Sequence, residues 1–295
     1  MTEEEIKNAA ACYSYMRKRL VAESPVGTDG KTIREHCDGL VERSIAASEA
    51  DAHTIWETLY PLPFYSAMKI EFASRRVQSA LKGGWLSDFR MLAGAESSTN
   101  HPWHVARQNN RYVAIGSEAR EFCSRSGRYE GMSLKTNPFV IQRLSRLATI
   151  FEVELRKSPN STEPFLNILA GKDIKDRESW ALAHAKLESA IGPITAAHAM
   201  TDCGFRMVKP DIWITRIATR CGWIKTHTDA QLANNRHGGW QVLFDTCHEI
   251  ASYASAEFPS KNPLREFDFY VANYGMRYRP DTAPVFEANP SLIAA

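Results

Sequence analysis

The segment "ESAIGPITAAHAMTDCGFRMVKPD", residues 188–211, decides the fold that we expect for this chain. A helical pattern, with apolar residues three and four apart, runs into Gly192. Pro193 then suits the first position of a second helix, because an N–H at that position has no partner inside the helix. The second helix is rich in small residues and stops at Gly204. The segment therefore predicts two short helices joined by a tight glycine turn, whose exposed N–H groups suit a phosphate.

The following segment, "VKPDIWITRIATRCGW" (208–223), predicts a further helix that begins at Ile212 and stops at Gly222. Asp211 stands directly in front of this helix, where aspartate is a preferred N-cap. Two interpretations stay open: Asp211 is a helix cap alone, or it is also the carboxylate on which the function depends. A helix end holds a carboxylate in a fixed place, and the helix dipole favours a negative charge there.

Basic residues gather around Asp211, although the net charge of the whole chain, 36 − 34 = +2, says little about partners. Between Phe205 and Lys225, Asp211 is the only acid. The basic residues of this stretch are Arg206, Lys209, Arg216, Arg220 and Lys225. A polyanion lying across the segment and a solvated helix face rich in Arg and Lys explain this cluster equally well.

Composition and cysteine usage limit the class of protein. With 295 residues, 44% apolar and 24% charged, the chain has the composition of an ordinary globular protein. No apolar run approaches the roughly 20 residues that span a bilayer, and the acidic start does not resemble a secretory signal. The six cysteines include no C-x-x-C pair, which argues against a zinc ribbon, an iron–sulfur cluster or a disulfide scaffold. We therefore expect a cytoplasmic bacterial protein with no metal, no other cofactor and no membrane partner.

Helical periodicity dominates the chain, and strand-like alternation is scarce. A strong helical pattern covers 137–157, and a last helix opens at Asn262-Pro263 and closes at Gly275. The segment "KSPNSTEP" (157–164) is the best candidate for a boundary between two helical lobes. We predict an all-α fold with an N-terminal helical region, a helix-hairpin-helix region with a returning C-terminal helix, and an irregular tail. These regions cover 1–157, 164–275 and 276–295.

The hairpin and the aspartate segment together resemble the helix-hairpin-helix superfamily of DNA glycosylases, which includes endonuclease III, the 3-methyladenine glycosylases and the 8-oxoguanine glycosylases. The match covers about 45 residues, in "AIGPITAAHAM" (190–200) and in 208–223, and extends elsewhere only to the helical pattern. The resemblance implies that Asp211 is the essential carboxylate, in a cleft between the two lobes. It also implies contacts to the DNA backbone from Gly192, Pro193, Ile194, Thr195, Lys209 and Arg216. For Lys209, a fallback role as a lyase nucleophile stays open beside the phosphate contact.

Two departures from the family pattern matter for the chemistry. The hairpin of the family often has two glycines, and the first of them falls at Ala190 here. Bifunctional members carry a lysine nucleophile at a position that reads Ile194, and isoleucine cannot form a Schiff base. We therefore expect no lyase chemistry. The four-cysteine cluster of the endonuclease III branch is also missing, since only Cys221 and Cys247 lie downstream of Asp211.

A glycosylase needs a carboxylate near the sugar and access to its base. Cleavage of the N-glycosidic bond passes through an oxocarbenium-like transition state, which a fixed carboxylate stabilises while it orients the attacking water. The base must be flipped out of the duplex into a pocket with stacking aromatic rings and polar groups. Candidates for this pocket, for which ordinary packing is an alternative at every position, are Trp103, His104, Phe139, Phe267, Asp268 and Tyr270. A metal site starting from His101 and His104 lacks an evident third ligand.

We therefore expect a monomeric, monofunctional DNA glycosylase that acts on double-stranded DNA and leaves an abasic site. The loop "STNHPWHVARQNNRY" (98–112) suits a damaged or enzymatically modified base better than uracil, for example a hypermodified base of phage DNA. An ordinary surface loop explains this segment equally well. The role is then base excision repair or defence against phage. The alternatives are a non-catalytic helix-hairpin-helix DNA-binding module, in which Asp211 is only a cap, and a helical protein-interaction domain.

Overall fold

The structure is a computed structural model that describes residues 1–24, 26, 27, 29–65, 77, 89–93, 137–159 and 161–278. Every regular element in these ranges is a helix and none is a strand, which confirms the all-α prediction. Within the same ranges, no helix combines the length and the apolar character that crossing a membrane requires.

The chain forms two compact units, and each is built from segments that lie apart in the sequence. Unit 1 comprises Met1–Ser48, Ile174–Trp180 and Met200–Ala295, and unit 2 comprises Glu49–Asp173 and Ala181–Ala199. The segment 157–164 lies inside unit 2, so the units do not divide where the sequence suggested. The N-terminal segment belongs to unit 1 because its helices pack against helices near the C-terminus. Local periodicity cannot reveal such a distant pairing.

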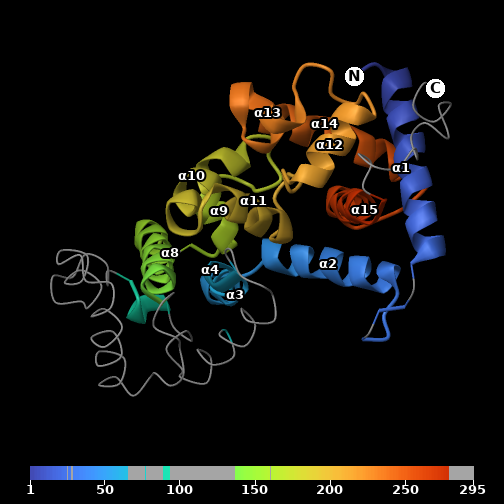
Figure 1. The fold of residues 1–295 in the computed structure, drawn as a ribbon. Coiled ribbons are helices and arrows are strands. Elements are labelled where there is room, and N and C mark those ends of the chain that lie inside the picture. The colour runs from blue at the N-terminus through green and yellow to red at the C-terminus, as the bar shows by residue number, and fades with distance from the viewer. Residues whose placement is uncertain are drawn as a thin grey trace. The chain divides into compact units, whose positions relative to one another are not determined.

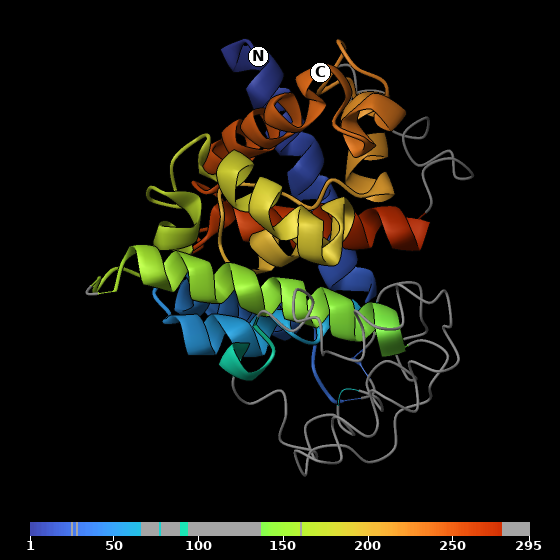
Figure 2. The same cartoon turned by 90° about the vertical axis from the view of Figure 1, so that its left-hand side faces the viewer.

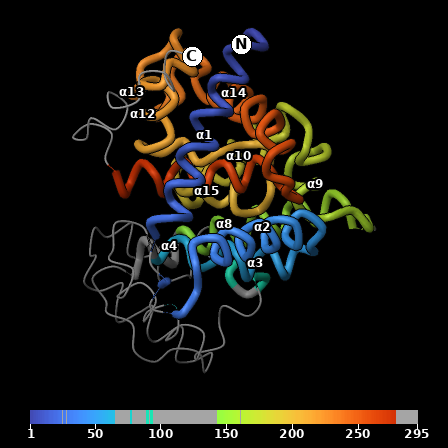
Figure 3. The backbone as a smooth tube through the Cα atoms, turned by 90° about the vertical axis from the view of Figure 1, so that its right-hand side faces the viewer, coloured from blue at the N-terminus to red at the C-terminus, as the bar shows by residue number. Residues whose placement is uncertain are grey.

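Helix α15 (Pro263–Tyr278) is the central helix of unit 1. The other elements of this unit are α1 (Glu3–Glu23), α2 (Ile33–Ser48), α12 (Ile212–Arg220), α13 (Asp229–Ala233), η2 (Arg236–Gly238) and α14 (Gly239–Ala254). Helix α15 packs against α1, α2, α12 and α14, and Figure 1 shows it end-on among them. Figure 3 shows α1 crossing α15. Because neighbours cover α15 on several sides, even its charged residues Arg265, Glu266 and Asp268 are buried.

The last helix extends past the end that the sequence suggested. We expected it to close at Gly275, but α15 continues to Tyr278. A Cβ atom on Gly275 would lie 2.8 Å from Cβ of Trp213 in α12, which is closer than two carbon atoms pack. Glycine at this position therefore permits the close approach of two helices instead of ending one of them. The first three residues of the predicted irregular tail, 276–278, are therefore helical, and the rest of the tail lies outside the described residues.

The helices of unit 2 enclose an aromatic core. They are α3 (Ala52–Leu59), α4 (Leu62–Tyr65), η1 (Phe89–Met91), α8 (Asn137–Lys157) and α9 (Phe165–Ala170). Helix α8, drawn in green in Figure 2, has the bounds that its sequence pattern predicts. Its buried Phe151 contacts Trp56 and Phe165, with ring centroids 5.7 and 4.4 Å apart respectively. Ring pairs at these separations stabilise a core beyond the area that they bury.

Two further helices, α10 (Ser179–Ile191) and α11 (Pro193–Asp202), follow each other with Gly192 between them, as the sequence predicts. The division between the units falls within each of these helices, so residues 181–199, which include the glycine turn, belong to unit 2. The end of α11 belongs to unit 1.

Candidate functional site

Asp211 is the N-cap of α12. Its backbone is extended (φ −84°, ψ 171°), and its Oδ1 atom accepts hydrogen bonds from the N–H groups of Trp213 (2.8 Å) and Ile214 (3.0 Å). These bonds satisfy two of the donors at a helix start that no helical carbonyl reaches. The residue is half-buried. Both capping bonds use Oδ1, so the second carboxylate oxygen, Oδ2, takes no part in the cap.

The backbone in front of Asp211 is fixed by bonds to α15 and to itself. The N–H of Lys209 donates to Oδ1 of Asp268 (2.7 Å), and the N–H of Asp211 donates to the carbonyl of Lys209 (2.8 Å). Pro210 lies between them, and its ring restricts its own φ. Val208, just before, is fully buried. The segment therefore holds Asp211 in one place, as a carboxylate that stabilises charge at a defined position requires.

A charge network lies behind this segment; it is buried at Arg265 and Asp268 and partly exposed at Asp202 and Lys209. The guanidinium of Arg265 donates to Oδ2 of Asp268 (2.5 Å) and to Oδ1 of Asp202 (2.7 Å). The Nζ atom of Lys209 lies 3.2 Å from the same Asp202 oxygen. Burial raises the pKa of Asp268 to about 6, while the positive charges of Arg265 and Lys209 oppose the rise. The carboxylate of Asp211 also raises the pKa of Asp268, so the two acids interact.

A left-handed glycine and three local contacts define the turn between α10 and α11. Gly192 has a φ of +85°, a left-handed conformation that strains any residue with a Cβ atom. Its N–H donates to the carbonyl of Glu188 (2.9 Å), and its own carbonyl accepts from the N–H of Ala196 (2.9 Å). The Nε2 atom of His184 lies at hydrogen-bond distance, 2.9 Å, from the carbonyl of Pro193. One glycine thus ends α10 and starts α11.

The surface of this turn is formed by the first residues of α11. Pro193 and Ile194 are exposed, Ile194 by 41%, and Thr195 is half-buried. The N–H groups of Ile194 and Thr195 lie in the first helical turn, where no helical carbonyl is available as an acceptor. Such N–H groups suit a phosphate oxygen. The residue that the resemblance aligns with the lyase lysine is therefore an isoleucine at the surface.

The glycine turn belongs to unit 2, while Asp211, Lys209 and Arg216 belong to unit 1. A cleft that brings the turn and the carboxylate together stays a prediction. Comparison of the chain with protein-family models, with curated proteins and with solved structures finds no match. The resemblance to the helix-hairpin-helix glycosylases therefore rests on the residues of this chain alone.

The two basic side chains predicted to bind DNA phosphates have protein partners. Lys209 pairs with Asp202, and the Nε atom of Arg216 lies 3.7 Å from a carboxylate oxygen of Asp229 in α13. The guanidinium of Arg216 also lies 5.8 Å from the ring centroid of Trp213. The side chains of Lys209 and Arg216 are 23% and 27% exposed. Ion pairs near the surface contribute little stability, so a phosphate can share these cations at small cost, and the DNA contact stays a prediction.

Three of the predicted pocket residues lie in α15. Phe267 and Tyr270 are 0% exposed. The ring centroids of Phe267 and Tyr13 are 4.8 Å apart, and the guanidinium of Arg17 lies 5.0 Å from the ring centroid of Tyr270. The structure thus gives these two aromatic residues a packing role in unit 1, and neither ring is accessible to a flipped base. Asp268 instead holds the backbone in front of Asp211, as described above.

The remaining pocket candidates are not described at the level of their side chains. Trp103 and His104 lie outside the described residues, as does His101. Phe139 lies in the first turn of α8, and only its backbone is described. The role of these residues in recognising a base stays a prediction.

Sequence reasoning missed Asp202 and Arg265, the two residues that complete the charge network. They lie 63 positions apart, so no local pattern connects them. One sequence feature was available: Arg265 and Asp268 are three apart on a helix, a spacing at which opposite charges meet.

Proposed function

We propose that the protein is a monofunctional DNA glycosylase, which hydrolyses the N-glycosidic bond of a damaged or modified base in double-stranded DNA and leaves an abasic site. The observation that carries the proposal is Asp211, a half-buried carboxylate whose Oδ1 caps α12 while Oδ2 takes no part in the cap. The resemblance of residues 190–200 and 208–223 to the helix-hairpin-helix glycosylases supports the same conclusion.

The chemistry needs one fixed negative charge near the sugar. Departure of the base leaves positive charge on the deoxyribose ring, as in other glycoside hydrolyses. In the proposed reaction, Oδ2 of Asp211 faces this charge and accepts the proton of the attacking water, while the bonds from Trp213 and Ile214 to Oδ1 keep the carboxylate from turning. A side chain that caps a helix is well suited to this task because its position is already determined before DNA binds.

The glycine turn would hold the DNA backbone. The N–H groups of Ile194 and Thr195 and the helix dipole of α11 favour a phosphate at this point. Ile194 carries no amine, and the amine of Lys209 is paired with Asp202. The proposed product is therefore an abasic site in an intact strand, formed in base excision repair or in defence against phage DNA with modified bases.

The decisive experiment is mass spectrometry of the free bases released from a panel of duplexes. The panel holds uracil, 8-oxoguanine and alkylated bases, together with DNA of phages whose cytosines carry substituents. We expect release of a damaged or modified base and a matching number of abasic sites. Uracil as the best substrate would contradict the substrate class, and the absence of any released base would contradict the enzymatic function.

The second candidate is a non-catalytic DNA-binding module. It is favoured by the fact that the two hydrogen bonds accepted by Oδ1 of Asp211 are capping bonds, which a purely structural aspartate would also make. A gel shift with duplex DNA, followed by an assay for abasic sites, separates the two functions. Binding without abasic sites on any member of the panel would establish the module.

A further inference from the structure

A cavity of about 370 Å³ lies in unit 1, and its lining contains none of the residues considered above. It is bordered by α2, by α15 and by the segment that follows α1. Cavities of this size hold small organic ligands in many proteins. The sequence analysis singled out neither α2 nor the α1–α2 connection, so the function proposed above leaves this cavity unexplained.

Helix α2 lines the cavity with one of its faces. The four residues concerned are Ile33, His36, Leu40 and Arg43. They are three or four positions apart, which places them on the same side of a helix. The apolar side chains of Ile33 and Leu40 alternate with the polar side chains, so this wall combines an apolar surface with two basic groups.

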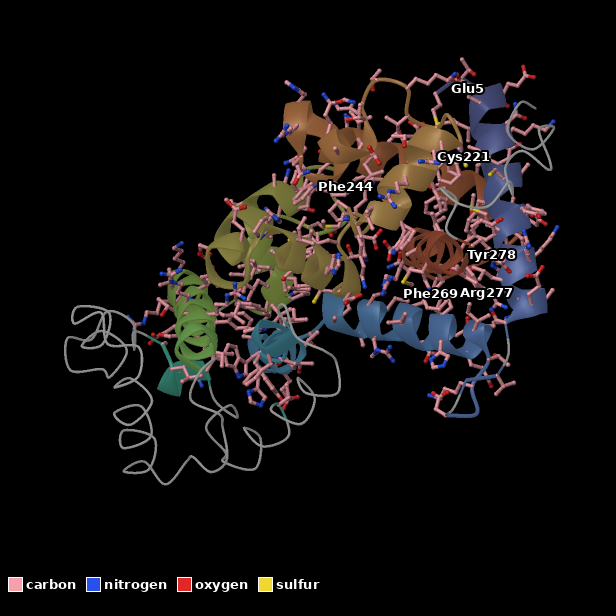
Figure 4. The ribbon with its side chains drawn as sticks, in the orientation of Figure 1. Glu5, Cys221, Phe244, Phe269, Arg277 and Tyr278 are labelled. Atoms are coloured by element: carbon pink, nitrogen blue, oxygen red, sulfur yellow. The ribbon has the colours of Figure 1, made fainter. Side chains whose placement is uncertain are left out.

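Helix α15 supplies the opposite wall with Phe269, Asn273 and Arg277, which are four positions apart. Figure 4 shows Phe269 and Arg277 on the side of α15 that faces α2. The side-chain amide of Asn273 is held by a hydrogen bond from Nδ2 to the carbonyl of Phe269 (2.7 Å). A half-buried ring beside an anchored amide suits a planar heteroaromatic group, which stacks on the ring and exchanges hydrogen bonds at its edge.

The two walls run in opposite directions. Asn262, at the start of α15, donates to Oγ of Ser44 near the end of α2 (3.2 Å). At the other end of α15, Arg277 donates to Oγ of Ser24, just before the α1–α2 connection (2.9 Å). Arg43 therefore lies toward one end of the cavity, and Arg277 lies toward the other. Phe269 and Arg277 are eight positions apart, which corresponds to a helix rise of about 12 Å.

Positive charge is present at both ends. Arg43 lines one end, while Lys31 and Arg277 line the other. Among the described lining residues there is no aspartate or glutamate. The Arg277 guanidinium donates to two neutral oxygens, the hydroxyl of Ser24 and the carbonyl of Glu23, and its charge also helps to lower the pKa of the Glu23 carboxyl group. A fourth basic side chain of the lining, His36, lies near the middle, with its Nε2 atom 3.4 Å from a carboxylate oxygen of Asp29, which is not part of the lining.

We infer that this cavity binds one nucleotide unit with a phosphate on each side of its nucleoside. The base lies against Phe269, one phosphate lies at Arg43, and the other lies at Lys31 and Arg277. A free nucleoside bisphosphate and a single-stranded nucleic acid both supply this chemistry, since single strands are bound by cations along the backbone and aromatic rings under the bases. The inference goes beyond base release at Asp211 and does not depend on it.

Isothermal titration calorimetry of the full chain tests the inference with deoxyadenosine 3′,5′-bisphosphate, deoxyadenosine and inorganic phosphate as separate probes. We expect the bisphosphate to bind about tenfold or more tightly than either of the other probes, because only it engages the ring and both charged ends. A five-residue deoxyadenosine oligonucleotide distinguishes the sources. Tighter binding of the oligonucleotide indicates a strand, and equal binding indicates a free nucleotide.

Matched variants localise the binding. Arg43→Gln should weaken the bisphosphate about tenfold, whereas Arg34→Gln, on the same helix and exposed but outside the lining, should not. Phe269→Leu should weaken the bisphosphate and leave inorganic phosphate unchanged, because only stacking is lost. Arg43 is exposed, so its variant keeps the fold even if the Phe269 variant does not. Equal binding of phosphate and bisphosphate, equal effects of the two arginine variants, or no binding of any probe would overturn the inference.

Discussion

Asp268 gives the stability of this protein a specific dependence on pH. In the unfolded chain its pKa is close to the ordinary value of 3.8, while in the folded protein burial raises the pKa to about 6. Between these pH values the folded state binds more protons than the unfolded state, so the free energy of unfolding falls as pH rises. The contribution of Asp268 to the free energy of unfolding is fully present below about pH 4 and is lost as pH rises through about 6. A difference of about two pKa units corresponds to about 3 kcal/mol.

The variant Asp268→Asn removes this titration and keeps the shape of the side chain. Chemical denaturation at pH 4, 5, 6 and 7 gives the free energy of unfolding of the native protein and of the variant. We expect the difference, native minus variant, to fall by about 3 kcal/mol across this range. Asp38→Asn, at an exposed position on α2, is the matched control and should show no such fall. A difference that stays constant with pH, or that grows as pH rises, would refute the reasoning about the buried carboxyl.

Two further predictions concern a pair of glycines and the side chain of Ile194. Gly204 and Gly30 both have a positive φ, but a Cβ atom on Gly204 would lie 2.7 Å from the carbonyl oxygen of Ser44, whereas a Cβ atom on Gly30 meets nothing within 4 Å. Gly30→Ala should therefore lower the free energy of unfolding by about 1–2 kcal/mol through conformational strain. Gly204→Ala should lower it clearly more, because strain and the clash with Ser44 add up. Equal losses of stability for the two variants in thermal melts would argue against the close approach of Gly204 and Ser44. Borohydride should trap no covalent protein–DNA adduct, because Ile194 has no amine; a trapped adduct would point to Lys209 as a nucleophile.

Local sequence patterns predicted several of the described helices well. The bounds of α8 and the start of α12 after Asp211 agree with the periodicity and the capping residue. Gly192 with Pro193 separates α10 from α11 for the same reason, since each residue acts on its own backbone. Signals of this kind are complete within a few residues.

Long-range packing was beyond the reach of the same patterns. Gly275 had the sequence context of a helix stop, but its absent Cβ serves the contact with Trp213 in another helix. Phe267 had the appearance of a pocket residue because a buried ring and a binding ring look alike in a sequence. The association of α1 with α14 and α15 likewise depends on residues more than two hundred positions apart, for example Arg17 and Glu266.

The candidate site was predicted in part. Asp211 was identified from its place before α12, and the structure adds that only Oδ1 serves the cap. The support behind it was not predicted, because the network joins Asp202, Lys209 and Arg265 from three separate segments. The fixed position of a carboxylate is thus decided by residues that share no local motif with it.

The rate of base release by Asp211→Asn, measured in a single turnover on the best substrate, tests the proposed catalytic role most directly. Asn is as good an N-cap as Asp, so the helix stays capped while the charge is lost. Asp51→Asn, at the N-cap of α3, makes the same change at another helix start and serves as the control. We expect the rate to fall on the order of 100-fold or more for Asp211→Asn, with duplex binding retained, and to stay unchanged for Asp51→Asn. An unchanged rate for Asp211→Asn would show that Asp211 is a helix cap and nothing more.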